Sequence, residues 1–137
     1  MGRKLKKNNT GNAPEFVSSH RFARISPPKV RLVMNQVRGM KVDEAMQLLK
    51  FSTRRGAHFI DKVLKSAVAN ADHKLNEGLL EDDQDFDLED LYIHEAFVDV
   101  GPSFKRWRPR ARGMAYPIIK RTSHISIKLR PLATQAS

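Results

Sequence analysis

The chain has 137 residues, with 25 Lys and Arg against 15 Asp and Glu, and carries a formal net charge of +10. It contains no cysteine, which excludes disulfides, thiolate zinc sites and cysteine nucleophiles, and no apolar run approaches the roughly 18 residues that cross a membrane. A pI near 10.2 is typical of a protein that binds nucleic acid.

The start of the chain is polar and basic, and we expect residues 1–14 to form a mobile N-terminal extension. No apolar segment follows, so this stretch does not predict a signal peptide, and we expect a cytoplasmic protein. Residues 15–130 are expected to form a single globular α+β domain. Residues 131–137 are expected to form a flexible C-terminal tail.

A strand and a helix are predicted before residue 40. Residues 17–25 have strand character. Ser26 and the two prolines after it predict a helix start, with Ser26 as the N-cap. One apolar stripe with helical spacing predicts a helix that Gly39 ends. The stripe consists of Val30, Val33, Met34 and Val37.

Two more helices are predicted between residues 43 and 78. A short one runs from Asp43 to about Lys50, with Ala45, Leu48 and Leu49 inward. Either Ser52 or Thr53 caps a longer third helix, whose pattern fades near residue 76. Its inward positions are Ala57, Ile60, Leu64, Ala67, Val68 and Ala71.

Acidic residues are concentrated in one segment. Residues 77–99 hold ten acids and no Lys or Arg, which leaves 25 basic against 5 acidic residues in the rest of the chain. Asp83, Asp85 and Asp87 have the spacing of calcium-loop ligands, but Leu88 stands where the loop requires glycine and His94 where it requires glutamate. We therefore predict no metal and no cofactor, and interpret the segment as a solvated loop or a dock for a basic neighbour.

Two strands are predicted at residues 91–100 and 125–129. The connection at about residues 101–117 is long for a loop, so it is either disordered or functional, and if it pairs it forms an extended hairpin tip. Arginines at 106, 108, 110 and 112 recur with period two, so in an extended chain all four would point to one side. Phe104 and Trp107 lie among them and are candidates to stack on bases. The alternative is a solvated basic loop with no ligand.

Cations from three parts of the chain are the predicted nucleic-acid contacts. Guanidinium groups suit phosphate oxygens because they donate in a planar fork. The predicted contacts are Arg21, Arg24, Lys29, Arg31, Arg38, Lys41, Lys105, Arg106, Arg108, Arg110, Arg112, Lys120 and Arg121.

Nothing in the sequence predicts a catalytic centre. The five histidines show no paired metal spacing. Ser123 and His124, as neighbours in a strand, point to opposite faces, which does not suit a nucleophile and its base. We therefore predict that the protein is not an enzyme.

Several short stretches, in a fixed order, carry a family resemblance. They are Lys29–Val33 (KVRLV), Arg38-Gly39, Val63–Ala71 (VLKSAVANA), Phe97–Asp99 (FVD), Gly101–Ser103 (GPS) with Lys105-Arg106, Pro109–Ala111 (PRA) with Gly113, and Lys120–Ile125 (KRTSHI). Over about residues 17–130, this ordered set resembles the bacterial large-subunit ribosomal protein number twenty-two family.

The resemblance implies an α+β fold, in which a small antiparallel sheet packs with three helices and a long β-hairpin protrudes. It further implies a structural constituent of the large ribosomal subunit that binds large-subunit rRNA, aids its assembly and lines the nascent-peptide exit tunnel with its hairpin tip. In that family the hairpin is also associated with macrolide action. The tunnel-lining residues would be Phe104, Lys105, Arg106, Trp107, Arg108, Pro109, Arg110, Ala111, Arg112, Gly113 and Met114.

The partners that the resemblance implies are large-subunit rRNA, ribosomal protein number four at the tunnel constriction and the passing nascent peptide. It implies a monomer within the ribosome and no membrane partner. Two alternatives stay open, a free-standing RNA- or DNA-binding regulator and an enzyme acting on RNA. The chain departs from the family in residues 1–14, 77–90 and 131–137, and in the bulk of Trp107.

Overall fold

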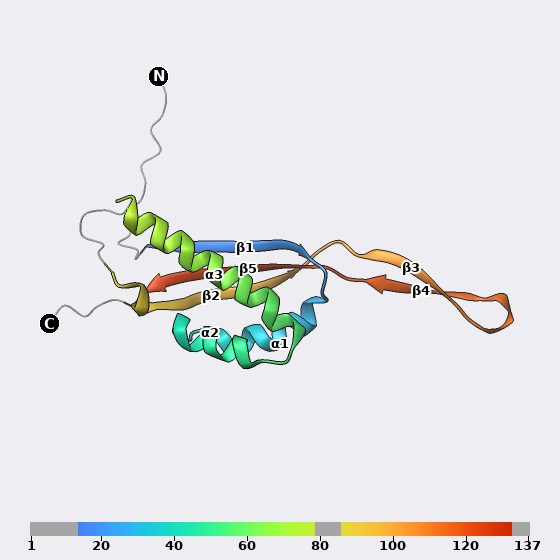
Figure 1. The fold of residues 1–137 in the computed structure, drawn as a ribbon. Coiled ribbons are helices and arrows are strands. Elements are labelled where there is room, and N and C mark those ends of the chain that lie inside the picture. Colours follow the sequence, from blue (N-terminus) through green and yellow to red (C-terminus); the bar gives the residue numbers. More distant parts are fainter. Residues whose placement is uncertain (1–13, 79–85, 133–137) are drawn as a thin grey trace, which may run out of the picture.

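A three-stranded antiparallel sheet with three helices on one side continues into a two-stranded hairpin (Figure 1). This computed structural model describes residues 14–78 and 86–132. The strands are β1 (Phe16–Ala23), β2 (Leu91–Val100), β3 (Phe104–Pro109), β4 (Ala115–Lys120) and β5 (Ser123–Pro131). The helices are α1 (Pro27–Val37), α2 (Val42–Phe51) and α3 (Arg55–Asn76), with short 3-10 turns η1 (Leu88–Asp90) and η2 (Ala111–Gly113). The predicted α+β fold with its protruding hairpin is confirmed.

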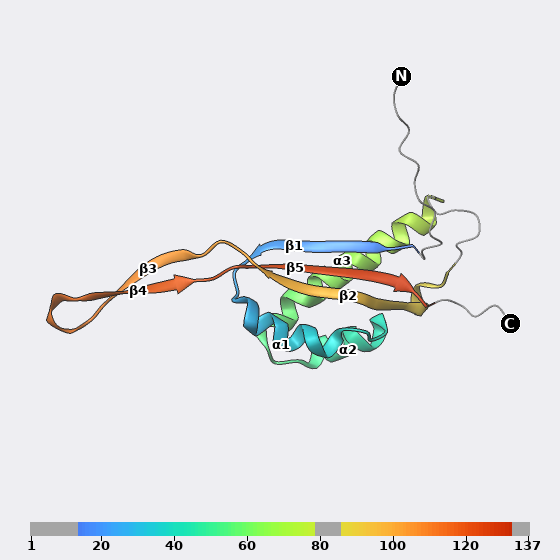
Figure 2. The same cartoon turned by 180° about the vertical axis from the view of Figure 1, so that it is seen from behind.

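Strand β5 is the centre of the sheet, whose order is β1-β5-β2. Its buried positions are Ser123, Ile125, Ile127, Leu129 and Pro131, and the residues between them are only partly buried. Because successive side chains of a strand point to opposite faces, one face of the sheet packs on the helices and the other stays open. Figure 2 shows this open face, with α3 behind the strands.

The apolar stripe predicted for the first helix is buried throughout. Val30, Val33, Met34 and Val37 are all 0% exposed. On α3 the predicted positions are buried except Val68, which is partly buried. On α2, two of the three predicted inward positions are buried, and the third, Leu48, is partly buried.

The predicted helix starts are correct in position only for α1. Ser26 is its N-cap residue, although the Ser26 side chain makes no capping hydrogen bond. The prediction that Ser52 or Thr53 caps α3 is wrong, because Arg54 occupies the N-cap position. Ser52 instead ends α2, since its backbone N–H donates to the Leu49 carbonyl at 3.3 Å.

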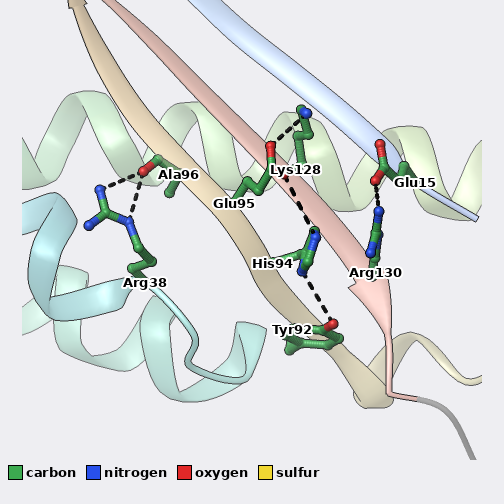
Figure 3. A network of polar contacts seen from close by, with 8 residues as sticks. All are labelled: Glu15, Arg38, Tyr92, His94, Glu95, Ala96, Lys128 and Arg130. Atoms are coloured by element: carbon green, nitrogen blue, oxygen red, sulfur yellow. Dashed lines mark hydrogen bonds and ion pairs between the residues drawn. The ribbon is translucent and has the colours of Figure 1, made fainter. Parts of the chain in front are cut away.

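Side chains of α1 and of its C-cap residue, Arg38, cover the outer edge of β2. Arg31 donates two hydrogen bonds to the Val98 carbonyl, at 3.2 and 2.8 Å. Arg38 donates two to the Ala96 carbonyl, at 3.0 and 2.6 Å (Figure 3). Carbonyls at an edge are otherwise open to another strand, so the two arginines take the place of a fourth strand.

The outer edge of β1 is covered in the same way by α3. The Asn70 side-chain amide donates to the Val17 carbonyl at 3.0 Å, and the Lys74 ammonium donates to the Glu15 carbonyl at 3.3 Å. Residues four apart on a helix share a face, as do these two donors. Both edges of the sheet are therefore occupied by donors from helices.

Several predicted segments fall wholly or partly outside the described residues. These are residues 1–13 of the N-terminal extension, residues 79–85 of the acidic loop and residues 133–137 of the tail. Pro131 lies in β5, and the Leu132 N–H donates to the Asp90 carbonyl at 2.9 Å. None of the described helices is both long and apolar enough to cross a membrane.

Candidate nucleic-acid interface

A groove of about 580 Å³ lies where the hairpin leaves the sheet, and we call it the basic groove. Its ten lining residues include six cations and no acid. All six cations are exposed, and none forms an ion pair with a described residue. They are Arg24, Lys29, Arg55, Arg106, Lys120 and Arg121. Such a cluster repels itself and is stabilised when it binds a polyanion.

Close packing of α1 against α3 brings two of these cations together. Gly56 is buried, and a Cβ atom built on it would lie 3.3 Å from the Lys29 carbonyl oxygen and the Val30 Cα. A larger residue would hold the helices apart. Gly56 thus lets Arg55 at the start of α3 and Lys29 in the first turn of α1 share one groove.

Phe104, the first residue of the hairpin, has a guanidinium from each side of the groove against its ring. The Arg24 guanidinium carbon lies 4.9 Å from the ring centroid and that of Arg106 lies 5.8 Å away. Exposed cation–π contacts of this kind are worth about 0.5–1 kcal/mol each. The ring therefore orients two like charges toward the same space without neutralising either.

A close contact between Gly101 and Thr122 fixes the base of the hairpin. The Gly101 N–H donates to the Thr122 carbonyl at 2.9 Å, and the Thr122 hydroxyl donates to the Pro102 carbonyl at 2.6 Å. Thr122 is only 2% exposed. A Cβ on residue 101 would overlap Thr122 Oγ1. The strands meet here at a distance that only glycine permits, and this contact sets the direction of the hairpin.

The register of β3 and β4 gives the hairpin two different faces. Residues paired across an antiparallel ribbon lie on the same face. The cationic face carries Phe104, Arg106, Arg108, Tyr116, Ile118 and Lys120. The apolar face carries Lys105, Trp107, Pro109, Ala115, Pro117 and Ile119. Trp107 is 67% exposed, so the apolar face stays uncovered within the described residues.

The prolines of the hairpin occupy the pairs Pro109–Ala115 and Trp107–Pro117. The Arg110 N–H donates to the Met114 carbonyl at 2.7 Å, so the pair next to Pro109 is hydrogen-bonded across the ribbon. Hydrogen-bonded and non-hydrogen-bonded pairs alternate, which places both prolines where the N–H would point outward. Each outer edge of the hairpin thus lacks one donor that another strand could use.

The tip corrects one expectation. The period-two arginines would share a face only in an extended chain, but β3 ends at Pro109 and the chain turns through η2. Arg112 has φ 60°, in the left-handed region. Arg110 is still extended (φ −127°, ψ 178°) and continues the alternation of Arg106 and Arg108, whereas Arg112 belongs to the turn.

Four of the remaining predicted contacts, Arg21, Arg31, Arg38 and Lys41, do not line the basic groove. The Arg31 and Arg38 guanidiniums are engaged by β2 carbonyls. Lys41 forms a bridge with Tyr92 at the end of the sheet opposite the hairpin, and Arg21 is exposed beside the ring of Phe22. The groove therefore unites five of the thirteen predicted cations, and it adds Arg55.

Two cations of the open sheet face are held in ion pairs, unlike those of the groove. Lys128 contacts Glu95 at 2.6 Å, and Arg130 contacts Glu15 (Figure 3). The hydrogen bond from Lys128 lowers the pKa of the Glu95 carboxyl below its usual value and raises the pKa of Lys128. This face therefore offers less free positive charge to a polyanion than the groove does.

No catalytic arrangement is present in the part of the chain that the structure describes. No group of three or more His, Asp or Glu is placed to hold a metal ion there. Ser123 is buried, whereas His124 lies on the open face and its Nδ1 accepts a hydrogen bond from the Phe22 N–H at 3.0 Å. The two side chains do not form a nucleophile–base pair.

A family model and two related proteins all point to the same family. The family model described as ribosomal protein L22p/L17e matches residues 18–130. A large ribosomal subunit protein uL22 from Finegoldia magna is 47% identical over 107 residues, which cover 78% of this chain and 88% of the relative. A protein of the same name from Ligilactobacillus salivarius is 55% identical over 104 residues, covering 76% and 83%. The matched region includes both the basic groove and the hairpin.

Proposed function

Because the chain belongs to the ribosomal protein L22p/L17e family, we propose that it is a structural constituent of the large ribosomal subunit and has no enzymatic role. The relatives are named as proteins of that subunit, and the matches cover more than four-fifths of each of them. This role places the chain in the bacterial cytoplasm, as one copy within a ribonucleoprotein.

The ligand we propose is large-subunit rRNA, held by the basic groove and the cationic face of the hairpin. The observation that carries this proposal is the absence of any acid among the ten residues that line the groove. Phosphate neutralises such a cluster and releases counterions. Arg106 belongs to both surfaces, so one RNA backbone can pass from the groove onto the hairpin. Arg21 and Lys41 would contact RNA only at the periphery, whereas Arg31 and Arg38 would hold the edge of β2 instead of RNA.

We further propose that the hairpin tip lines the nascent-peptide exit tunnel. The hairpin projects away from the helices and the sheet (Figure 1), and its residues are exposed except Ile118. The cationic face suits phosphate, which assigns the apolar face with Trp107 to the tunnel side. The tip would then contact the passing peptide and the neighbouring ribosomal protein number four.

The test is the salt dependence of binding to a transcript of the large-subunit rRNA. The affinity falls as salt rises, and each lost phosphate contact lowers the steepness of log K against log salt by about 0.7–0.9. Lys120→Ala should lower it by about that amount, whereas Lys62→Ala, an exposed lysine on α3 outside the groove, should leave it unchanged. The combined Arg24, Arg106, Lys120 and Arg121 alanine variant should lower it by about 2.8–3.6. Equal slopes for all variants would contradict an rRNA contact at the groove.

Co-sedimentation separates a ribosomal constituent from a free-standing regulator. The tagged full-length protein, expressed at its natural level, should migrate with the large subunit in a sucrose gradient. A protein found mainly in the ribosome-free fractions would overturn the ribosomal role and favour the regulator.

A further inference from the structure

Phe51 is the most exposed large hydrophobic residue of the described chain, at 82%. It is the last residue of α2. Its ring takes part in no aromatic or cation–π contact with a described residue. Phe104, by contrast, has a guanidinium from each side of the basic groove against its ring. The faces of the Phe51 ring are therefore open to another planar group.

The sequence around Phe51 is basic. Residues 45–60 contain Lys50, Arg54 and Arg55 and no acid. A second groove of about 850 Å³ lies between α2 and α3, and its lining includes these three cations together with Ser52 and Thr53.

The second groove also contains two acids, Asp61 and Asp43. The Asp61 carboxylate is paired with the Lys65 ammonium at 2.7 Å. Asp43 is exposed in the first turn of α2. Four cations against two acids leave the lining positive by two charges, with His58 counted as neutral.

Arg55 connects this surface to the interface already described, because it lines both grooves. Its guanidinium carbon lies 5.9 Å from the ring centroid of Phe59. Arg54 and Lys50 continue this positive surface along the second groove. Phe51 follows Lys50 in the chain, and its exposed ring lies outside the lining of that groove. Proteins bind single-stranded RNA with aromatic rings on which bases stack and with cations that pair with the phosphates. Phe51 and the cations that neighbour it in the chain supply both kinds of group.

We propose that Phe51 stacks on an unpaired base of the large-subunit rRNA, with Lys50, Arg54 and Arg55 on the adjoining phosphates. The inference rests on the proposed function and extends it to a surface that sequence reasoning did not single out. A partner protein would instead use Phe51 as an apolar contact, for which aromatic character is not required. An RNA base and a partner protein can therefore be distinguished by whether residue 51 must be aromatic.

The test uses the full-length protein and a transcript of the large-subunit rRNA. Phe51→Ala should bind about five- to 150-fold more weakly, the range that a lost base–aromatic stack gives. Its salt slope should stay unchanged, because no charge is removed. Phe51→Leu should bind as weakly as Phe51→Ala, and Phe51→Tyr should bind like the parent chain. Leu32→Ala, which changes another exposed apolar residue at 55% exposure, is the matched control and should bind normally.

Two readouts guard against misfolding and against failure of the underlying function. Thermal unfolding of Phe51→Ala should match that of the parent chain, since the ring is exposed. Lys120→Ala is measured in the same assay. If Lys120→Ala lowers the salt slope while Phe51→Ala binds normally, the stacking inference fails and the proposed function stands. Phe51→Leu with parental affinity would also overturn stacking. If neither Lys120→Ala nor Phe51→Ala changes binding, both proposals fail.

Discussion

The contact between Gly101 and Thr122 allows a quantitative prediction about how the hairpin is aimed. In Gly101→Ala the new Cβ would overlap Thr122 Oγ1 and lie 3.2 Å from the Thr122 carbonyl carbon and oxygen. Restoring an ordinary separation of about 3.5 Å requires the strands to part by about 1 Å. Overpacking of this size costs about 1–3 kcal/mol of stability.

The same displacement is amplified along the hairpin. A shift of about 1 Å across a strand spacing of about 4.8 Å is a tilt of about 12°. Each strand of the hairpin has six residues, which span about 20 Å at about 3.3 Å per residue. The tip would therefore move by about 4 Å. A displacement of this kind is large enough to break hydrogen bonds between the tip and RNA.

A double-mutant cycle measures the effect. Urea unfolding should show Gly101→Ala destabilised by about 1–3 kcal/mol and Thr122→Ala by about 1 kcal/mol, since it loses the hydrogen bond to Pro102. The double variant should be more stable than the sum predicts, because removing Oγ1 makes room for the new Cβ. Additive effects, or a Gly101→Ala protein as stable as the parent chain, would refute the proposed steric role of Gly101.

Three further predictions concern other contacts. Arg31→Met and Arg38→Met should each lose about 1–3 kcal/mol in urea unfolding, with an unchanged salt slope for rRNA binding, and a lowered slope would show that these arginines contact phosphate. Glu95→Gln should make stability less dependent on pH below about pH 5, because a carboxyl whose pKa is lowered by Lys128 contributes above its unfolded pKa and loses that contribution on acidification; parallel pH profiles of unfolding would contradict this. Trp107, the only tryptophan, should have water-exposed fluorescence in the free protein and change emission on assembly into the subunit, and an unchanged spectrum would argue that the apolar face remains in bulk water.

Periodicity predicted most of the helices and strands, whereas their assembly into a sheet with three helices and a protruding hairpin came from the family resemblance. The stripe of Val30, Val33, Met34 and Val37 is the buried face of α1, and the alternation of Ile125, Ile127 and Leu129 is that of β5. Such patterns are visible because burial repeats with the geometry of the element. Boundaries were less accurate, as at Arg54, because several neighbouring residues can occupy an N-cap position.

The interface was predicted less completely, since charge is visible in a sequence but its partner is not. Nothing in the sequence distinguishes Arg31 and Arg38 from Arg24, yet of the three only Arg24 lines the basic groove. Arg55 was missed because its role depends on the approach of two helices at Gly56, which no periodicity records. The period of the tip arginines holds as far as Arg110, but the turn with Arg112 at positive φ takes the fourth arginine out of the alternation.

The donors at the two sheet edges have a consequence for the time between synthesis and assembly. A ribosomal protein must exist for a period without its RNA, and a three-stranded sheet with bare edges would then be a template for other copies. Here Asn70 and Lys74 occupy one edge, and Arg31 and Arg38 occupy the other. A chain that waits for assembly into the subunit is thereby protected from the strand-to-strand polymerisation that leads to aggregates, and this protection is intrinsic to the fold.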